Sequence, residues 1–278
     1  MSQGERGAEY WNAVITGRTA RRPAATWRAH ADRVNADLCR AFWPSTRPGR
    51  ILKTDLFDEA SGTGLLPVLA GACGAVYGID HAENTAALGR ARHPAVRATV
   101  ADVRVLPFAS GVFDLVISNS TLDHFENRGD IARSLRELTR VLRPGGRLIL
   151  TLDNPANPVV VLRNSLPFAW LSRLRLVPYY VGKTAGAGEG RRLLAAAGLR
   201  QVAVGAALHC PRAPAVGLAS LLDRVAWSWP RRALLALLGG FERLGRLPTR
   251  YLTGYYVTFV ADKIKENTDV GVGRKVSV

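Results

Sequence analysis

The chain has 278 residues, which is long enough to bury a full hydrophobic core, and its formal net charge is +16 at pH 7. It has no run of about 18 apolar residues, as a membrane-spanning helix needs, and its first residues lack the apolar segment of a signal peptide, so we expect a cytoplasmic protein. Its three scattered cysteines lack C-x-x-C spacing, which argues against a disulfide framework and a zinc site, and we predict no bound metal.

Arginine supplies most of the positive charge, since only five of the 38 basic residues are lysine. A basic surface attracts the phosphates of nucleic acid, but these arginines are dispersed along the chain instead of forming one basic run. Dispersed arginine is typical of proteins from GC-rich genomes. The pattern therefore disfavours a nucleic-acid partner and leaves contact with an anionic membrane surface as an open alternative.

The first predicted element is an amphipathic helix over residues 25–43, which Pro44 ends. Strands that alternate with helices predict a doubly wound parallel sheet, whose ligands lie at the carboxyl ends of the strands. Polar residues at these ends, such as Asp80, Asp102 and Asn119, should therefore share one site. Five apolar, strand-like segments carry this prediction, at 50–57, 75–80, 97–102, 112–120 and 147–153.

The second half of the chain is longer than such a sheet requires. Two adjacent strands need only a few connecting residues, whereas residues 211–253 separate the last two predicted strands and carry apolar residues at helical spacing. The expected organisation is an N-terminal helical lid at 1–48, a ligand-binding core at 49–155, an apolar-basic insertion at 156–187, the last helix and sixth strand at 188–210, a helical cap at 211–253, the final strand at 254–264 and a disordered tail at 265–278.

The stretch LFDEASGTGLL has two glycines after the first strand, as phosphate-binding loops do. However, Leu65 and Leu66 stand where a Walker loop needs Lys and Ser or Thr, and Pro67 stands where a dinucleotide loop needs its third glycine. The carboxylates of Asp58 and Glu59 would also repel a pyrophosphate. The loop therefore predicts a cationic or hydroxyl-bearing ligand without phosphates.

Four motifs occur in order between residues 50 and 153. They are SGTG after the first strand, VYGID in the second, VADVRVLPFASGVFDLVISNSTLDHF across the third and fourth, and LTRVLRPGGRLILT into the fifth. Together they resemble the class I S-adenosylmethionine-dependent methyltransferases, methyltransferase type 11 group. The resemblance implies an α/β fold with a doubly wound, seven-stranded, mostly parallel Rossmann-like sheet, here with an N-terminal helix and a helical insertion before the last strand. It also implies S-adenosyl-L-methionine as cofactor and methyl transfer as the activity.

The resemblance assigns roles to residues at the strand ends. It implies that Gly62 and Gly64 permit close approach of the cofactor, that Asp80 accepts both ribose hydroxyls, that Asp102 and the Val103 backbone recognise the adenine edge, and that Asn119 lines the methionine end. The other predicted cofactor-binding residues are Asp55, Asp58, Glu59, Ala60, His81 and Ser120.

The glycine loop departs from the family pattern of an acidic residue followed by x-G-x-G-x-G, because Ala60 stands at the first glycine. Read without gaps, Asp58 is the acidic residue that meets the methionine ammonium. A second register starts the strand at 50–52, makes 53–55 the loop and sends 59–64 into the following helix. We favour the first register, and the second stays open.

Methyl transfer from a sulfonium mainly needs proximity and alignment, and it needs a general base only when the acceptor must lose a proton. His124 is the candidate base because it follows the fourth strand, where the acceptor should meet the methyl group. His30, on the first helix, is a candidate lid residue. The candidate acceptor-binding residues are Tyr179, Tyr180, His209 and Tyr255.

The leading hypothesis is a methyltransferase that acts, at oxygen, on a small apolar, lipid-like or natural-product acceptor. An RNA or protein methyltransferase is the alternative, but Ser120-Thr121 follow Asn119 where such enzymes have an N/D-P-P-Y/F motif. A cofactor-binding scaffold without turnover is a third hypothesis, which Ala60 favours. The segments 156–187 and 211–253 have three candidate roles: a lid over the acceptor, a face for a lipid surface, and a homodimer interface.

Overall fold

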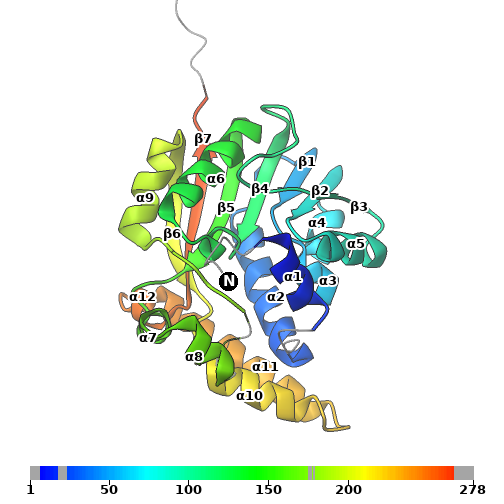
Figure 1. The fold of residues 1–278 in the computed structure, drawn as a ribbon, viewed down its shortest axis with the longest axis vertical. Coiled ribbons are helices and arrows are strands. Elements are labelled where there is room, and N and C mark those ends of the chain that lie inside the picture. The colour runs from blue at the N-terminus through cyan, green and yellow to red at the C-terminus, as the bar shows by residue number, and fades with distance from the viewer. Residues whose placement is uncertain (1–6, 18–23, 175–176, 178, 266–278) are drawn as a thin grey trace, which may run out of the picture.

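The computed structural model describes residues 7–17, 24–174, 177 and 179–265, so the predicted disordered tail lies outside the described residues except for its first position. A seven-stranded sheet with the order β3-β2-β1-β4-β5-β7-β6 runs through the molecule (Figure 1). β7 is antiparallel to β5 and β6, and the other pairs are parallel, which confirms the predicted fold. The strands are β1 (Arg50–Lys53), β2 (Ala75–Asp80), β3 (Val96–Val100), β4 (Phe113–Asn119), β5 (Leu142–Asp153), β6 (Leu199–Ala207) and β7 (Tyr256–Lys263).

The sheet separates two apolar cores, because successive side chains of a strand point to opposite faces. In β1, Leu52 packs in a core that includes Leu135 of α6, while its neighbour Ile51 packs in a core that includes Cys39 of α2. These central strands are apolar on both faces, as strands covered on both sides should be. The helices around the sheet are α2 (Ala25–Ala41), α3 (Phe57–Ser61), α4 (Leu66–Ala70), α5 (Glu83–Arg92), α6 (Arg128–Val141) and α9 (Ala187–Ala196).

A further group of helices gathers at the carboxyl edge of the sheet. A third apolar core joins α2 to α10 and α11 through Trp27, Ala219 and Leu234, and the α10–α11 hairpin extends past the sheet (Figure 1). Among the described residues, no helix combines the length and apolar character that crossing a bilayer requires. The elements of this group are α1 (Ala8–Ile15), η1 (Leu122–His124), α7 (Pro158–Ser165), α8 (Phe168–Arg173), α10 (Arg212–Leu222), α11 (Trp229–Phe241), η2 (Glu242–Arg246) and α12 (Arg250–Thr253).

The long connection from β6 to β7 is attached to the sheet at both ends. Glu242 accepts hydrogen bonds from the backbone N–H groups of Leu208 and His209, both at 3.1 Å. The side-chain amide of Asn154 donates to the carbonyl oxygen of Gly254 at 2.8 Å. These bonds hold the base of the insertion against the carboxyl edge of the sheet.

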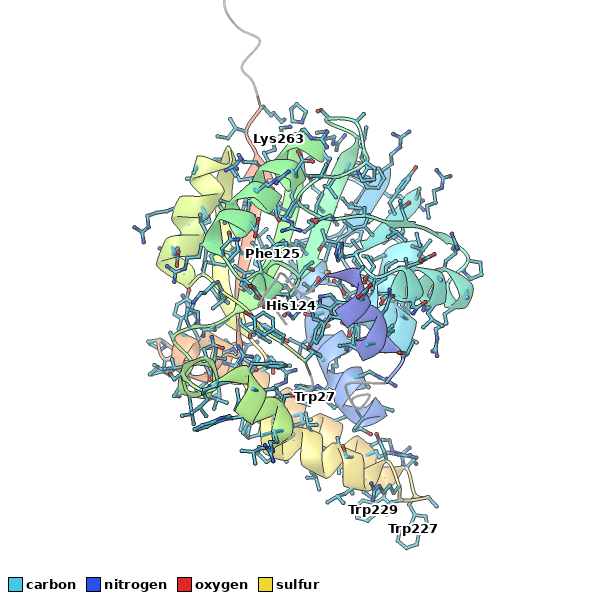
Figure 2. The ribbon with its side chains drawn as sticks, in the orientation of Figure 1. Trp27, His124, Phe125, Trp227, Trp229 and Lys263 are labelled. Carbon is cyan, nitrogen blue, oxygen red and sulfur yellow. The ribbon has the colours of Figure 1, made fainter. Side chains whose placement is uncertain are left out.

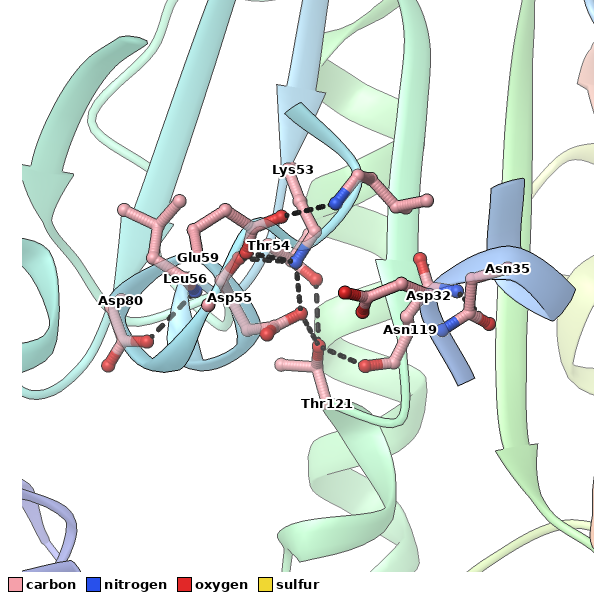
Figure 3. Close-up of polar contacts among 12 residues, drawn as sticks. Asp32, Asn35, Lys53, Thr54, Asp55, Leu56, Glu59, Asp80, Asn119 and Thr121 are labelled. Atoms are coloured by element: carbon pink, nitrogen blue, oxygen red, sulfur yellow. Dashed lines mark hydrogen bonds and ion pairs between the residues drawn. The ribbon is translucent and has the colours of Figure 1, made fainter. Parts of the chain in front are cut away.

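A buried lysine ends β1. Lys53 is 1% exposed, and its Nζ lies 2.9 Å from Glu59 Oε2 and 3.2 Å from Asp55 Oδ2 (Figure 3). Burial lowers the pKa of Lys53, but the carboxylates of Asp55 and Glu59 raise it above its ordinary value, so the lysine stays charged. Because Glu59 belongs to α3, the ion pair holds this helix against the strand end. The chain therefore turns into a helix at Phe57 instead of continuing the predicted strand to that residue.

We expect Lys53→Met to lower the free energy of unfolding by about 3–5 kcal/mol, because the buried Glu59 carboxylate loses its counter-charge. Urea titration followed by circular dichroism measures the change. The double variant Lys53→Met/Glu59→Gln should be more stable than the single one, since that buried charge is gone. A loss below about 1 kcal/mol in the single variant, the size of an exposed ion pair, would contradict this role of Lys53.

Candidate functional site

A cavity lies at the carboxyl edge of the sheet, beneath α1 and α2. The ends of β1, β2, β3 and β4 line one part of it, and Leu208, Arg212 and Tyr256, beside β6 and β7, line another. Trp27 and His124 mark this region in Figure 2. The strand order places β2 and β7 four strand spacings apart, on the order of 19 Å. The cavity can therefore hold an elongated ligand, or two ligands end to end.

The loop after β1 contributes Thr54 and Asp55 to the cavity lining. Gly64 instead makes room for Glu59: its φ is +54°, and a Cβ there would lie 2.3 Å from Glu59 Oε1. The turn after the strand is residues 54–56, so the structure is nearer to the second register, although α3 ends at Ser61 and residues 62–64 are not helical. Asp58 also lines the cavity, whereas the lining does not include Glu59, Ala60, Gly62 and Gly64.

Asp80, at the end of β2, offers a carboxylate to the cavity. Its Oδ2 accepts the backbone N–H of Leu56 at 3.0 Å (Figure 3), and its Oδ1 accepts that of Ala82 at 2.8 Å. Because a carboxylate has about four lone-pair sites, each oxygen can accept a further bond from a ligand. Burial raises the pKa of Asp80 to about 7, against these hydrogen bonds. The next residue, His81, also lines the cavity.

Asp102 and Val103 follow β3 and line the same part of the cavity. The Asp102 carboxylate accepts the backbone N–H of Arg104 at 2.8 Å and a guanidinium N–H of the same residue at 2.6 Å. Burial raises the pKa of Asp102, but these bonds and the charge of Arg104 lower it below its ordinary value. Arg104 therefore holds Asp102 as a carboxylate at the cavity wall.

Asn119 and Ser120, at the end of β4, show two unusual features. The Asn119 amide donates to Asn35 Oδ1 at 3.1 Å, but its own Oδ1 is buried and has no hydrogen-bond partner among the described residues. Ser120 has a φ of 47°, and Leu208 has a φ of 60°. Both of these left-handed residues line the cavity, as do the strained residues of many functional sites.

His124, in η1, also lines the cavity. Its Nδ1 lies 3.0 Å from the carbonyl oxygen of Tyr180, which can only accept, so the neutral ring carries its proton on Nδ1 and a lone pair on Nε2. Nε2 lies 3.8 Å from Asp123 Oδ1, and burial together with Asp153 raises the pKa of Asp123 to about 6. The ring is thus oriented as a proton acceptor.

The structure separates the four predicted acceptor-binding residues. Tyr179 lines the cavity, with its ring centroid 5.6 Å from that of His124. His209 lies outside the lining, between Thr253 and a backbone carbonyl. Tyr180 and Tyr255 are also outside it, and Tyr255 accepts a bond from Arg163 at 2.7 Å. The candidate lid residue His30 is 1% exposed, lies beside Cys210 of the third core and is not part of the cavity lining.

Several lining residues were missed by sequence reasoning. Arg28, Asp32 and Asn35 follow one another at helical spacing on α2, and this polar stripe is the signal that could have identified them. Sequence reasoning chose Tyr255 and missed its neighbour Tyr256. The apolar composition of the final strand does not show which alternate residues face the cavity. Sequence reasoning also missed the lining residues Trp11, Trp27 and Arg212.

The donor end of the cavity fits a ligand with hydroxyl and cationic groups. Asp80 has free lone pairs, Asn119 has a buried oxygen that lacks a donor, and Asp58 adds a third acceptor group. These are the groups that a ribose and a methionine ammonium would satisfy, so the residues present fit S-adenosylmethionine. Within the described ranges, no three His, Cys, Asp or Glu side chains are arranged to hold a metal ion.

Comparison with known proteins gives a consistent picture. Residues 57–150 match the model of a methyltransferase domain. Over 118 residues the chain is 42% identical to demethylmenaquinone methyltransferase of Thermus thermophilus, covering 40% of this chain and 50% of that one. Over 95 residues it is 40% identical to 2-phytyl-1,4-naphtoquinone methyltransferase of Nostoc punctiforme, covering 32% and 40%. The chain thus spans half or less of the length of these relatives.

A solved structure extends the likeness over most of the fold. The geranyl diphosphate C-methyltransferase of Streptomyces coelicolor, in complex with Mg²⁺, geranyl diphosphate and S-adenosyl-L-homocysteine, matches with a TM-score of 0.52 at 17% identity, covering 83% of this chain and 76% of that one. The strand order, the matched domain and the strand-end residues agree with one another. Residues 57–150 therefore match a methyltransferase domain, and the sheet has the Rossmann-like fold of the class I methyltransferases.

Proposed function

We propose that this protein transfers a methyl group from S-adenosylmethionine to a small apolar or lipid-like acceptor, at oxygen. One observation carries the proposal: a single cavity joins an acidic end at β2 and β3 to an aromatic end at β7 and α10. The acidic end suits the donor, and Trp11, Trp27 and Tyr179 provide an apolar surface for the acceptor.

At the donor end, Asp80 accepts the ribose hydroxyls, and Val103 and Asp102 face the adenine. Asp55 and Asp58 are the carboxylates available to the methionine ammonium. Bound there, S-adenosylmethionine supplies a methyl group on a good leaving group. The protein's contribution is to align the acceptor with it and to exclude water, which α1 and α2 do by covering the cavity.

At the acceptor end, we assign His124 as the general base. Its Nε2 carries a lone pair, and its ring is packed against Trp11 at 4.7 Å between centroids. A hydroxyl that reaches Nε2 would lose its proton to the imidazole as the oxygen takes the methyl group. Asp123, buried beside it, favours the imidazolium that results.

The names of the similar proteins support an apolar acceptor. The two curated relatives are named for quinones, and the solved structure for geranyl diphosphate, so all three names describe lipid-like molecules. An acceptor of this class would partition into membranes.

The α10–α11 hairpin supports a second part of this proposal, namely peripheral binding to an anionic membrane. Trp227 and Trp229 are 68% and 61% exposed and lie at its far tip (Figure 2). Arg224 and Arg232 are exposed beside them, and tryptophan with arginine suits the headgroup region of a bilayer. The acidic residue nearest the tip, Asp223, accepts the backbone N–H of Thr26 at 3.3 Å. The outward charge of the tip is therefore positive.

The proposed activity is tested by incubating the protein with methyl-labelled S-adenosylmethionine and a panel of naphthoquinols, prenyl phosphates and hydroxylated lipids. Label in the organic extract is the expected result. Label in an RNA or protein fraction would instead favour the alternative acceptors. Heat of binding with S-adenosylhomocysteine but no transfer to any fraction would identify a scaffold.

We expect the affinity for S-adenosylhomocysteine to fall about tenfold between pH 8 and pH 6, measured by calorimetry. The pKa of Asp80 in the free protein is about 7. The ribose hydroxyls donate to the ionised form of Asp80 and so bind it better than the protonated form. As the pH falls, protonation of Asp80 therefore competes with ligand binding. Asp80→Asn should flatten this profile and weaken binding at pH 8 by about 1.5–3 kcal/mol. A parent profile that is flat from pH 6 to 8 would refute the assignment.

His124→Gln should lower kcat by about 10²–10⁴-fold with the acceptor found by the screen, because the base is removed. Its Kd for S-adenosylhomocysteine should stay within about twofold of the parent value, since the donor end is unchanged. His209→Gln is the matched control, as His209 lies outside the cavity lining, and it should retain near-parent kcat. Equal activity of both variants would mean that transfer proceeds without this base.

The protein should sediment with phosphatidylglycerol vesicles at low salt, less so at high salt, and not with phosphatidylcholine vesicles. Trp227→Ala/Trp229→Ala should weaken this binding at least about tenfold. The control is Val100→Ala/Val105→Ala, which removes exposed apolar groups in the edge strand β3 and in the loop that follows it. No vesicle binding by the parent, together with a dimer in analytical ultracentrifugation that the tryptophan variant loses, would favour the homodimer interface instead.

A further inference from the structure

Arg212 is the first residue of α10 and the one residue of the insertion 211–253 among the cavity-lining residues. We propose that its guanidinium binds an anionic oxygen group of the acceptor, a carboxylate or a phosphate, so that the substrate is an apolar molecule with an anionic head. This inference rests on the proposed function and adds the chemical class of the acceptor.

The surroundings of Arg212 are aromatic. Its guanidinium carbon lies 4.5 Å from the ring centroid of Tyr255 and 5.9 Å from that of Trp27. Such contacts hold the plane of the guanidinium, which bonds the Tyr179 side chain and has further N–H groups at its edge for a ligand. The charge also reaches Tyr179: burial raises the pKa of this phenol to about 12, and Arg212 opposes that rise.

Arg212 differs from its neighbour Arg163, whose charge is already compensated. Arg163 Nη2 lies 2.5 Å from Asp153 Oδ2, and its Nη1 donates to the Tyr255 hydroxyl at 2.7 Å. In the part of the chain that the structure describes, no carboxylate oxygen lies within 4.0 Å of the Arg212 guanidinium. Burial lowers the pKa of Arg212, whereas the Asp153 carboxylate acts on Arg212 through its charge and raises this pKa, but its ion pair is with Arg163. A bidentate oxyanion would therefore add a direct partner that suits the geometry of the Arg212 guanidinium.

The position of Arg212 on its helix strengthens the inference. The N-terminal end of a helix carries a partial positive charge, so a cation in the first turn is opposed by the helix and an anion is favoured there. The first turn of α10 has no acidic residue, and its N-cap residue, Pro211, makes no side-chain capping bond. The local backbone and Arg212 thus attract the same sign of charge.

The cavity also gives the rest of such a molecule a place. Trp27 is in contact with Arg212, and Trp11 and Tyr179 lie together at 5.8 Å between centroids. Both of these rings are next to His124, at 4.7 and 5.6 Å. With its anionic head at Arg212, an acceptor would lay its apolar body on this aromatic surface and bring its reacting hydroxyl to His124.

The test compares three probes that share one apolar body: 2-naphthoate, 2-naphthyl phosphate and the neutral 2-naphthamide. Each is titrated calorimetrically into the parent protein, with and without S-adenosylhomocysteine. We expect at least one anion to bind about tenfold or more tightly than the amide, as a charged hydrogen-bonded pair would give. The anion that binds with the lower Kd identifies the head group as carboxylate or phosphate.

In Arg212→Met, the affinity for each anion should lie within about threefold of the affinity for the amide. Arg212→Lys should keep part of the parent's preference for anions over the amide. Arg243→Met is the matched control, because Arg243 is exposed in the same insertion and lies outside the cavity lining, and it should behave as the parent does. Equal binding of anion and amide by the parent, or an undiminished preference in Arg212→Met, would overturn the inference.

The two proposals fail separately. If S-adenosylhomocysteine does not bind, the methyltransferase function is lost, and the probe titrations without it still report on Arg212. If S-adenosylhomocysteine binds and the anions show no preference, only the anionic head group is refuted. An unchanged Kd for S-adenosylhomocysteine in Arg212→Met shows that the variant is folded and that the donor end is intact.

Discussion

The charge of Lys53 lies inside the protein, and the chain around it is arranged to keep that charge compensated. The ion pair with Glu59 draws the start of α3 under the end of β1, and Gly64 is needed because the Glu59 carboxylate fills the space beside it. The glycine-rich segment therefore packs behind a carboxylate instead of facing the ligand. In its place, Thr54 and Asp55 form the wall of the cavity, which makes this wall polar and acidic.

The two ends of the cavity differ chemically because the sheet brings them from different parts of the chain. Strands β1 to β4 come from the region that matches the methyltransferase domain or lies just before it, and their ends supply carboxylates. Leu208, Arg212 and Tyr256 come from beyond residue 199, after the matched region. The antiparallel pairing of β7 places its first residue, Tyr256, opposite Asp153, and so at the same edge as the ends of the parallel strands. A single edge thus combines side chains from the region matched by the methyltransferase domain with side chains from beyond it.

The sequence predicts the alternation of strands and helices, because buried parallel strands are apolar on both faces and amphipathic helices repeat every 3.6 residues. It also predicts that Asp80, Asp102 and Asn119 lie together at strand ends. The order and direction of the strands fix the positions of these residues, and side-chain packing has little influence on them. It does not predict that Gly62 and Gly64 lie off the cavity, because that depends on where a buried lysine finds its carboxylates. The choice between Tyr255 and Tyr256 depends on which of two neighbouring residues faces the cavity. Packing of the strand determines this, and composition does not reveal it.

The insertion between β6 and β7 presents two surfaces that lie apart from each other. Its outer surface, with Trp227 and Trp229, meets the solvent far from the sheet, whereas only its first turn reaches the cavity. On the proposed function, the tip meets the membrane and Arg212 meets the acceptor. Glu242 and the Asn154 amide hold the base of the insertion against the sheet, and the residues of the tip are not part of the cavity lining. A substitution at the tip should therefore change the proposed membrane contact without changing the proposed acceptor contact.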